Sequence, residues 1–299
     1  MLDYSLLVAL ATVVQEGSFE RAAKALHLTP SAVSQRVRLL EERMGCALVV
    51  RSHPCRATET GRHLCQHVDR VQLLEHELRS VLPSVDPLGA ARVRLPIAVN
   101  ADSLATWFAP ALTAFENEPS VLMDVTVDHE GHTTEWLRSG AVLAAVTATA
   151  EPTTGCSSIA LGTMRYRAVA SPSFMARYYS QGVNADSLAR APSLLFSTKD
   201  DLQARWVQRL CQHHVELHRH TIPLSQAFVT AALAGIGWGL HPQALIQQYL
   251  DGGSLVELVA DSPLDVPLYW QRARAASTVL DRLTQVVRSA ASVPLRNDI

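Results

Sequence analysis

The sequence predicts an α/β protein made of a small helical N-terminal unit, a long linker helix and a larger C-terminal unit. Three observations support this fold class. Two short helical patterns meet at a tight corner within residues 18–44, and an amphipathic helical pattern covers residues 59–82. From residue 92 onward, strand and helix patterns alternate. With 299 residues, the chain is long enough for two domains.

The N-terminal unit carries the signals of a helix-turn-helix. A first helix is predicted over residues 3–16, where the apolar residues form one stripe. Ser18 can cap a second helix, and Thr29 followed by Pro30 favours the start of a third. Only His27 and Leu28 separate the second and third patterns, so the two helices are expected to meet at a tight corner.

The third predicted helix has two different faces. Its apolar face is expected to pack into a small core and carries Val33, Val37, Leu40 and Met44. The opposite face offers short hydroxyls, an amide and a guanidinium, which suit close approach to base edges and phosphates in a DNA major groove. With the capping residue, this predicted DNA-contacting set is Thr29, Ser31, Ser34, Gln35 and Arg38. A solvated amphipathic helix is the simpler alternative, but the caps, the corner and the following segment favour DNA binding.

A basic wing is predicted over residues 47–58. A short strand at 48–50 is broken by a turn at His53-Pro54, and Arg51 and Arg56 flank that turn. These arginines are expected to meet phosphates or the adjacent minor groove. Residues 17–58 contain seven Lys or Arg against three Asp or Glu, whereas the whole chain has a formal net charge of −2. The charge pattern therefore predicts a local DNA-binding surface and excludes a generally basic, non-specific binder.

The run SAVSQRVRLLE at residues 31–41, followed by Arg51, Arg56 and TETG at 58–61, resembles the LysR-type transcriptional regulators. The resemblance extends along the chain. LPIAVNADSLATWFAPAL at 95–112 and PLYW at 267–270 are similar to the ArgP/LysG branch of that family, which controls export of basic amino acids. The resemblance to LysR-type regulators implies that residues 1–58 form a winged helix-turn-helix domain that binds double-stranded promoter DNA.

The amphipathic pattern that begins at residue 59 predicts a linker helix. Its apolar positions recur at steps of three and four residues: Leu64, Val68, Val71, Leu74, Leu78 and Val81. A helix between two domains cannot bury such a stripe alone, so a second copy of the chain is expected to cover it. The resemblance implies the same, a homodimer or homotetramer. Residues 59–89 are assigned to this helix and to a hinge at 83–89, where prolines and a glycine break the pattern.

The C-terminal domain is assigned to residues 90–299. Strands are predicted at 93–99, 122–128 and 142–147, helices at 103–115 and 133–139, a second unit from 165–170 to 264, a returning strand at 267–270 and a last helix at 278–290. This alternation predicts a mostly parallel sheet with helices on its faces. It resembles the two-lobed type-2 periplasmic-binding-protein fold of the family's effector domain. Lobe I would be formed by 90–163 and 268–299, and lobe II by 164–267.

An effector is expected between the lobes, outside the carboxyl ends of the strands. The candidate residues there are Asn100, Asp102, Ser103, Asp128, Glu130 and Thr147. Ser103 is predicted to cap a helix whose N-terminus favours a carboxylate, although capping alone is the simpler interpretation. Asp128 and Glu130 can hold a cationic group or form a solvated acidic turn.

Lobe II contributes Ser225 and Gln226, which open a predicted helix. Related regulators tend to carry an acidic residue at the position of Gln226. Glutamine keeps the capacity for hydrogen bonds but has no charge, so we expect only modest affinity for lysine or arginine.

Catalytic, metal and cofactor sites are not expected. Five cysteines without a CxxC pair argue against a disulfide framework and a structural zinc site. His214 and His218 are spaced as one helical turn, but arginines surround them and no carboxylate completes a set. Glycines at 235–239 follow a predicted helix and precede a strand, the reverse of a dinucleotide loop. The chain contains no GxSxG, HExxH or P-loop motif.

A cytoplasmic location with reduced thiols is expected. No run of about 18 apolar residues predicts a membrane helix, and the apolar N-terminal stretch lacks a basic leader and a cleavage site. The resemblance implies a transcriptional regulator that senses a small amino acid, lysine or arginine. It would control genes of amino acid export or metabolism and contact RNA polymerase at the promoter. The alternatives are an architectural DNA-binding protein with a vestigial effector domain, and an enzyme built on the binding-protein fold.

Overall fold

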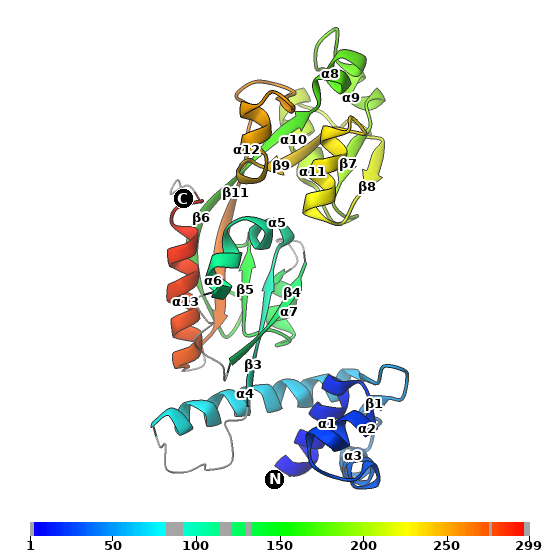
Figure 1. Ribbon diagram of the computed structural model, residues 1–299, viewed down its shortest axis with the longest axis vertical. Coiled ribbons are helices and arrows are strands. Elements are labelled where there is room, and N and C mark those ends of the chain that lie inside the picture. The colour runs from blue at the N-terminus through cyan, green and yellow to red at the C-terminus, as the bar shows by residue number, and fades with distance from the viewer. Residues whose placement is uncertain (1–2, 82–91, 114–120, 129–132, 275–276, 296–299) are drawn as a thin grey trace.

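The computed structural model describes residues 3–81, 92–113, 121–128, 133–274 and 277–295. The predicted hinge at 83–89 and the candidate Glu130 lie outside these residues. Figure 1 shows the helical N-terminal domain at one end of the long axis, lobe II at the other and lobe I between them. Within the described residues, no helix is long and apolar enough to cross a membrane.

The N-terminal domain is the predicted winged helix-turn-helix. Its elements are α1 (Tyr4–Glu16), α2 (Phe19–Ala25), α3 (Pro30–Met44), β1 (Val49–Val50) and β2 (Arg56–Ala57). As predicted, the hydroxyls of Ser18 and Thr29 accept the N-cap hydrogen bonds of α2 and α3. Val33, Val37 and Leu40 are buried, but the expectation that Met44 packs with them is wrong. Met44 is the last residue of α3 and is 37% exposed, because the end of the helix extends past the core.

The wing is fastened to the helices on both sides. The Glu41 carboxylate of α3 accepts hydrogen bonds from the backbone N–H groups of Leu48, at 2.9 Å, and Val49, at 3.3 Å. A Cβ atom at Gly61, in the next helix, would lie 2.1 Å from the Leu48 carbonyl oxygen. Only glycine allows this close approach, so the conformation of the wing depends on two residues outside it.

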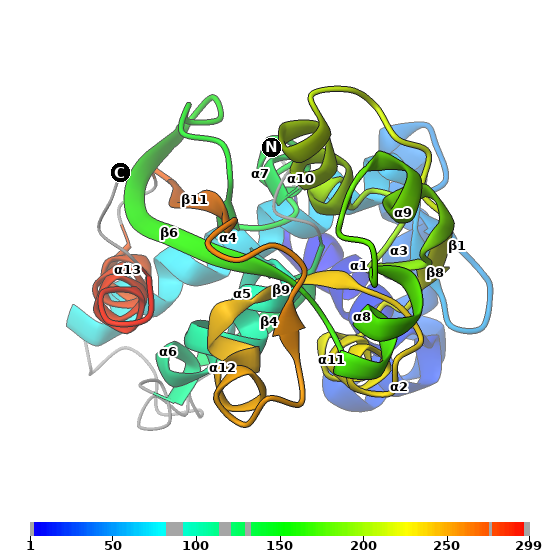
Figure 2. The ribbon, with the colours of Figure 1, turned by 90° about the horizontal axis from the view of Figure 1, so that it is seen from above.

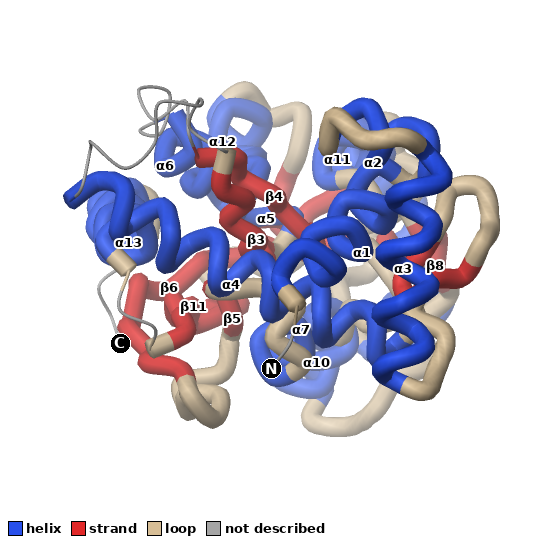
Figure 3. Tube along the Cα trace, turned by 90° about the horizontal axis from the view of Figure 1, so that it is seen from below, coloured by secondary structure: helices blue, strands red, loops and turns tan. Residues whose placement is uncertain are grey.

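The linker helix α4 (Glu59–Val81) packs against both domains. Val68 is buried in the core of the N-terminal domain, and Leu73 is buried in the core of lobe I. Figure 3 shows α4 crossing beneath the strands of lobe I. Leu74 and Leu78, on the predicted dimer stripe, have exposed fractions of 54% and 57%. The stripe is therefore divided, because Val68 is covered within the chain whereas Leu74 and Leu78 are not.

One sheet runs through the C-terminal domain. Its strands are β3 (Val93–Val99), β4 (Val121–Val127), β5 (Ala144–Thr147), β6 (Cys156–Ala170), β9 (Gly239–Pro242), β10 (Val256–Glu257) and β11 (Leu264–Ala273). The order is β10-β6-β11-β5-β3-β4, and β9 also pairs with β6. Strand β3 is parallel to β4 and β5, whereas β6 and β11 are antiparallel to each other. The parallel part is the predicted sheet of lobe I.

The helices of lobe I begin with a continuous helical run at residues 101–113. It consists of α5 (Ala101–Ser103), a π-helical turn (Leu104–Phe108) and α6 (Ala109–Thr113), and α7 (Thr133–Arg138) and α13 (Thr278–Ala291) complete the lobe. The prediction that Ser103 caps this helix is wrong. Asn100, directly after β3, has the extended backbone of an N-cap, so Ser103 already lies inside the helix.

Lobe II contains a small parallel sheet surrounded by helices. Its further elements are α8 (Pro172–Tyr178), α9 (Ala185–Arg190), β7 (Ser193–Leu195), α10 (Leu202–Cys211), β8 (Arg219–Thr221), α11 (Ser225–Leu233) and α12 (Gln243–Asp251). The predicted helical spacing of His214 and His218 is wrong, because α10 ends at Cys211.

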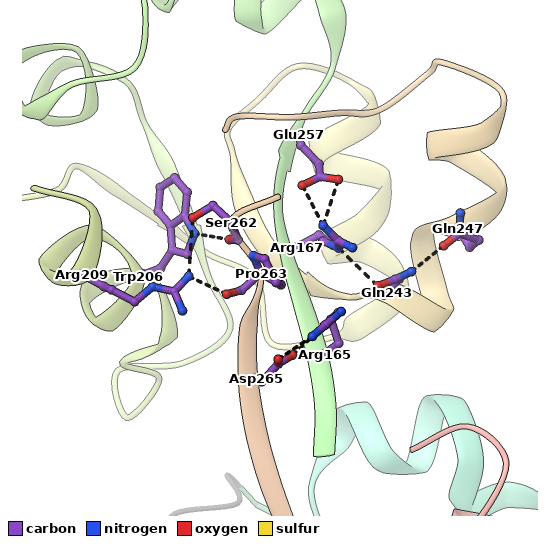
Figure 4. Close-up of polar contacts among 10 residues, drawn as sticks. All are labelled: Arg165, Arg167, Trp206, Arg209, Gln243, Gln247, Glu257, Ser262, Pro263 and Asp265. Carbon is purple, nitrogen blue, oxygen red and sulfur yellow. Dashed lines mark hydrogen bonds and ion pairs between the residues drawn. The ribbon is translucent and has the colours of Figure 1, made fainter. Parts of the chain in front are cut away.

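Strands β6 and β11 pass through both lobes, and Figure 2 shows β6 as one long curved strand. Both are longer than predicted, since they pair with each other from Leu264 opposite Tyr166 to Ala273 opposite Cys156. Charged pairs link β6 to β11 and to β10 where the lobes meet. Arg165 Nε donates to Asp265 Oδ1 at 2.8 Å, and Arg167 pairs with Glu257 at 3.1 Å (Figure 4). The two lobes are therefore connected by paired strands and not by a loop alone.

Candidate functional site

The predicted DNA-contacting residues of α3 lie on its outer side. Ser31, Gln35 and Arg38 are exposed, and Ser34 is half-buried. The Thr29 hydroxyl, besides capping α3, lies 3.0 Å from the Ser31 hydroxyl. Arg38 Nε donates to Glu42 Oε1 at 3.0 Å, and the Arg38 side chain is 77% exposed. An exposed ion pair of this kind contributes little to stability, so the guanidinium can exchange its partner for a base or phosphate.

The wing presents two exposed arginines. Arg56 lies on β2 and pairs through its backbone with Val50 on β1. The Arg51 guanidinium lies over the ring of Phe19, 5.1 Å from its centroid. This cation–π contact orients Arg51 beside the start of α2 without neutralising its charge. Arg38 on the helix and Arg51 and Arg56 on the wing are thus exposed cationic side chains of the kind that contact a nucleic-acid backbone.

A cleft opens between the lobes at the carboxyl ends of β3 and β4. It has a volume of about 490 Å³, its open mouth included. Its polar lining comes from both lobes and consists of Asn100, Asp102, Asp128, Asp200, Ser225 and His241. Its apolar lining includes Phe196, Phe228, Leu240 and Leu245. The cleft lies where the effector was predicted to bind, outside the strand ends and between the lobes, and its role as the effector site stays a prediction.

Asp102 joins three parts of the domain. Its carboxylate accepts a hydrogen bond from the Tyr166 hydroxyl of β6 at 3.0 Å and one from Ser225 Oγ of α11 at 3.1 Å. Ser225 belongs to lobe II, so this carboxylate connects the two walls of the cleft. Tyr166 was not predicted from the sequence, since its neighbours in β6 indicate only a buried strand.

Asp128 follows β4 and has a side chain that is 18% exposed. Its Oδ2 atom accepts a hydrogen bond from Trp136 Nε1 at 2.9 Å. Lys199, which reaches across from lobe II, places its ammonium nitrogen 3.3 Å from Asp128 Oδ1. Neither Trp136 nor Lys199 was predicted to belong to the site. Only the rarity of lysine could have drawn attention to Lys199 in the sequence, because just two of the 26 basic residues of the chain are lysines.

Two buried polar side chains line the cleft beside these carboxylates. Asn100 and His241 are 2% and 1% exposed. The Asn100 amide atoms and His241 Nε2 have no hydrogen-bond partner among the residues that the structure describes. Burial lowers the pKa of His241 to about 3, so its imidazole is neutral at physiological pH. Hydrogen-bonding capacity therefore remains for a polar molecule in the cleft.

Asp200 has a different role from the other acidic residues. Its carboxylate accepts hydrogen bonds from the backbone N–H groups of Phe196 and Leu202, each at 3.0 Å. Both oxygens therefore hold the loop that leads into α10, and Asp200 shapes the cleft wall.

Three predicted effector residues lie outside the lining of this cleft. Ser103 is buried, and its hydroxyl has no partner among the described residues. Thr147 is buried at the end of β5 and accepts a hydrogen bond from the Thr149 N–H at 3.1 Å. Gln226 is exposed and lines a neighbouring hollow with Val127 and Leu224. In the described part of the chain, no group of three metal-binding side chains comes together.

A winged helix-turn-helix joined to a two-lobed domain with a polar cleft defines a DNA-binding protein with a ligand-binding domain. Residues 4–62 match the bacterial regulatory helix-turn-helix protein, lysR family, and residues 89–292 match the LysR substrate binding domain. The chain belongs to the LysR family of transcriptional regulators, as its sequence indicated.

Relatives within this family resemble the chain over nearly its whole length. The HTH-type transcriptional regulator ArgP of Pseudomonas fluorescens is 45% identical over 285 residues, 95% of each chain. LysG of Mycobacterium tuberculosis is 43% identical over 291 residues, 97% of this chain and 94% of the relative. Because these relatives are transcriptional regulators, the regulatory interpretation is supported over an architectural DNA-binding protein.

Two solved structures of ArgP and LysG proteins are similar to this chain over its length. The crystal structure of ArgP from Mycobacterium tuberculosis has a TM-score of 0.80, 42% identity and 99% coverage of both chains. Full-length LysG from Corynebacterium glutamicum with bound effector Arg has a TM-score of 0.69 and 38% identity, and covers 99% of this chain and 100% of that one.

Proposed function

We propose that this protein regulates transcription in response to a basic amino acid, arginine or lysine, which binds between the lobes. The observation that carries this proposal is the position of Asp102 and Asp128 on one wall of the cleft, beside the buried and unpartnered amide of Asn100. Support comes also from the Corynebacterium glutamicum LysG structure, whose effector is Arg.

The three groups suit the three charged parts of such a ligand. The Asp128 carboxylate would pair with the side-chain cation, and Glu130 is a second candidate for this role. The Asp102 carboxylate would accept from the α-ammonium. The Asn100 amide and the N-terminus of the helical run at 101–113 would donate to the neighbouring α-carboxylate. A zwitterion needs both of its poles satisfied in a partly dry cleft, because an unpaired charge there is costly.

Ligand binding would act on DNA through the linker helix. Ser225 and Lys199 of lobe II both contact lobe I carboxylates, so a ligand that changes these contacts shifts one lobe against the other. Lobe I packs on Leu73 of α4, and the N-terminal domain packs on Val68 of the same helix. A change in lobe geometry would therefore alter the spacing of paired DNA-binding domains.

The regulator would work as a homodimer or homotetramer in the cytoplasm. A second copy would cover Leu74 and Leu78, which are large apolar residues exposed on α4. Two copies would place two winged helices on successive half-sites of a promoter. Regulation of amino acid export or metabolism genes would follow from a changed contact with RNA polymerase.

A thermal-shift screen of the full-length protein against the twenty amino acids tests this function. Arginine or lysine should raise the unfolding temperature, since a ligand that binds only the folded state stabilises it. Citrulline, the neutral analogue of arginine, is the control for charge. If no amino acid changes the unfolding temperature while promoter DNA is still bound, the cleft is vestigial and the protein is an architectural DNA binder.

A further inference from the structure

The ammonium group of Lys199 occupies the position at Asp128 where a cationic ligand would bind. Lys199 lies in lobe II between β7 and α10, and Asp128 lies in lobe I at the end of β4. Its nitrogen is 3.3 Å from Asp128 Oδ1 and 3.5 Å from Oδ2, so it approaches both carboxylate oxygens. A primary ammonium on an alkyl stem is also the side-chain group of the ligand lysine.

We propose that Lys199 is a tethered counter-ion, which neutralises Asp128 while the cleft is empty and is displaced by the cationic group of the effector. This inference rests on the proposed function, because it requires Asp128 to hold that cationic group. Lys199 then determines specificity by competition, since a ligand must bring a positive charge of its own to Asp128.

The two partners differ in how firmly they are held. The Asp128 side chain is 18% exposed and is bound to Trp136 of its own lobe, so it stays in place without Lys199. Leaving this carboxylate unpaired would cost desolvation energy. The Lys199 side chain is 50% exposed, and its flexible stem can carry the ammonium into water. The carboxylate is thus a fixed site, and the ammonium is a movable occupant.

The backbone around Lys199 is held independently of this ion pair. The carboxylate of its neighbour Asp200 binds the N–H groups of Phe196 and Leu202, which are the two sides of the loop. Displacement therefore requires rotation of one side chain and not refolding of the loop. It also breaks a link between the lobes, which couples ligand charge to lobe geometry.

Calorimetry on full-length proteins tests the inference with arginine, lysine and citrulline as ligands. The proteins are the wild type, Lys199→Met, Lys199→Arg and Lys24→Met. Lys24, exposed on α2, is the other lysine of the chain and provides the matched control. Lys199→Met should bind arginine and lysine roughly three- to tenfold more tightly, because no ion pair has to break. Citrulline binding should not change, and Lys199→Arg and Lys24→Met should behave as the wild type.

Other outcomes would overturn the inference. Weaker binding of arginine by Lys199→Met means that Lys199 supports the ligand, and equal tightening for citrulline means that only space was gained. The wild-type measurement tests the proposed function separately. If the wild type fails to bind and Lys199→Met binds arginine, competition by Lys199 is supported; if neither protein binds, both proposals fail.

A direct observation of the ammonium group adds a readout independent of affinity. Carbon-13 labelling of lysine gives side-chain NMR signals from only two residues, Lys24 and Lys199. Titration with unlabelled arginine should move the Lys199 signal toward the position of the exposed Lys24, and citrulline should not. A Lys199 signal that does not move while arginine binds contradicts displacement.

Discussion

Ser225 and Asp102 connect the two lobes across the cleft, with Ser225 Oγ donating to Asp102 Oδ1 at 3.1 Å. Together with the pair of Lys199 and Asp128, this contact gives lobe I two carboxylates that already bind groups of lobe II. In this conformation Lys199 provides a counter-charge for Asp128, and Ser225 provides a neutral hydrogen bond to Asp102. Ligand binding is expected to replace these contacts, which links occupancy of the cleft to the relative position of the lobes.

Substitutions in helix α3 and in the wing are expected to have different effects on DNA binding. Arg38→Ala should weaken operator binding by about 1–3 kcal/mol and relax specificity at one position, if Arg38 contacts a base. Arg56→Ala should weaken binding to most sequences and reduce the slope of log affinity against log salt by about one unit. Fluorescence anisotropy over a salt series distinguishes the two. Arg177→Ala, at an exposed site in lobe II, is the control, and unchanged affinity in both test variants would refute the assignment.

The exposed residues Leu74 and Leu78 of α4 predict the position of the dimer interface. Leu74→Asp would place a charge in an apolar interface, at a cost of several kcal/mol. Analytical ultracentrifugation should then detect monomers, and operator binding should fall with dimerisation. Val293→Asp, at an apolar residue that is 90% exposed elsewhere, should leave the assembly intact. A Leu74→Asp protein that remains dimeric would show that the interface lies on another surface.

The cation site predicts a loss of affinity in Asp128→Asn. Asparagine keeps an acceptor for Trp136 but has no charge for the ligand, so arginine binding should weaken by about 1–3 kcal/mol. Calorimetry measures the change, and Asp186→Asn, on the exposed side of α9, controls for loss of a carboxylate elsewhere. Unchanged arginine affinity in Asp128→Asn would assign the cation to another residue, of which Glu130 is the first candidate.

A charge introduced at Gln226 is expected to change ligand affinity less than the loss of charge at Asp128. Its side chain is exposed on the hollow beside the cleft, so a carboxylate there would act on the ligand across solvent. Gln226→Glu should tighten lysine and arginine binding roughly twofold at low salt, and less at high salt. Calorimetry at two ionic strengths measures this. Weaker binding of both amino acids would show that position 226 does not act through charge on the cation.

The buried imidazole of His241 predicts a pH dependence of stability. Its pKa is about 3 when folded, against an ordinary value of 6.5, so the unfolded chain binds a proton more readily. Its contribution to the free energy of unfolding is therefore complete above pH 6.5 and decreases as the pH falls toward 3. The slope from this residue is up to about 1.4 kcal/mol per pH unit.

The variant His241→Gln should lose that slope, whereas the exposed His214→Gln should retain it. Urea unfolding between pH 6.5 and 4.5, followed by tryptophan fluorescence, measures the difference. All five tryptophans of the chain lie beyond residue 90, so the signal reports on the C-terminal domain. Equal slopes in the wild type and His241→Gln would mean that another group titrates.

Local signals determine the N-terminal domain almost completely. The caps at Ser18 and Thr29 and the short corner between their helices involve hydrogen bonds within three residues, so the sequence alone predicts them. The parallel strands β3, β4 and β5 and the helices of lobe I are predicted for the same reason, since their periodicity is local, whereas the part of β6 in lobe I was not predicted. The capping error at Ser103 shows the limit, because Asn100 and Ser103 are both good caps and the end of β3 selects between them.

The cleft was decided by contacts between residues distant in the chain. Lys199 lies 71 residues from Asp128, and Ser225 lies 123 residues from Asp102. The full length of β6 depends likewise on pairing with β11, whose Asp265 is 100 residues from Arg165. The periodicity of the sequence does not predict such pairs, because the partner of a side chain in a distant element depends on how whole elements pack. The sequence alone determined the parallel strands, the helices and the acidic residues Asp102 and Asp128 of lobe I, because these depend on local patterns. Only the tertiary structure decided the length of β6 and which lobe II groups face those carboxylates.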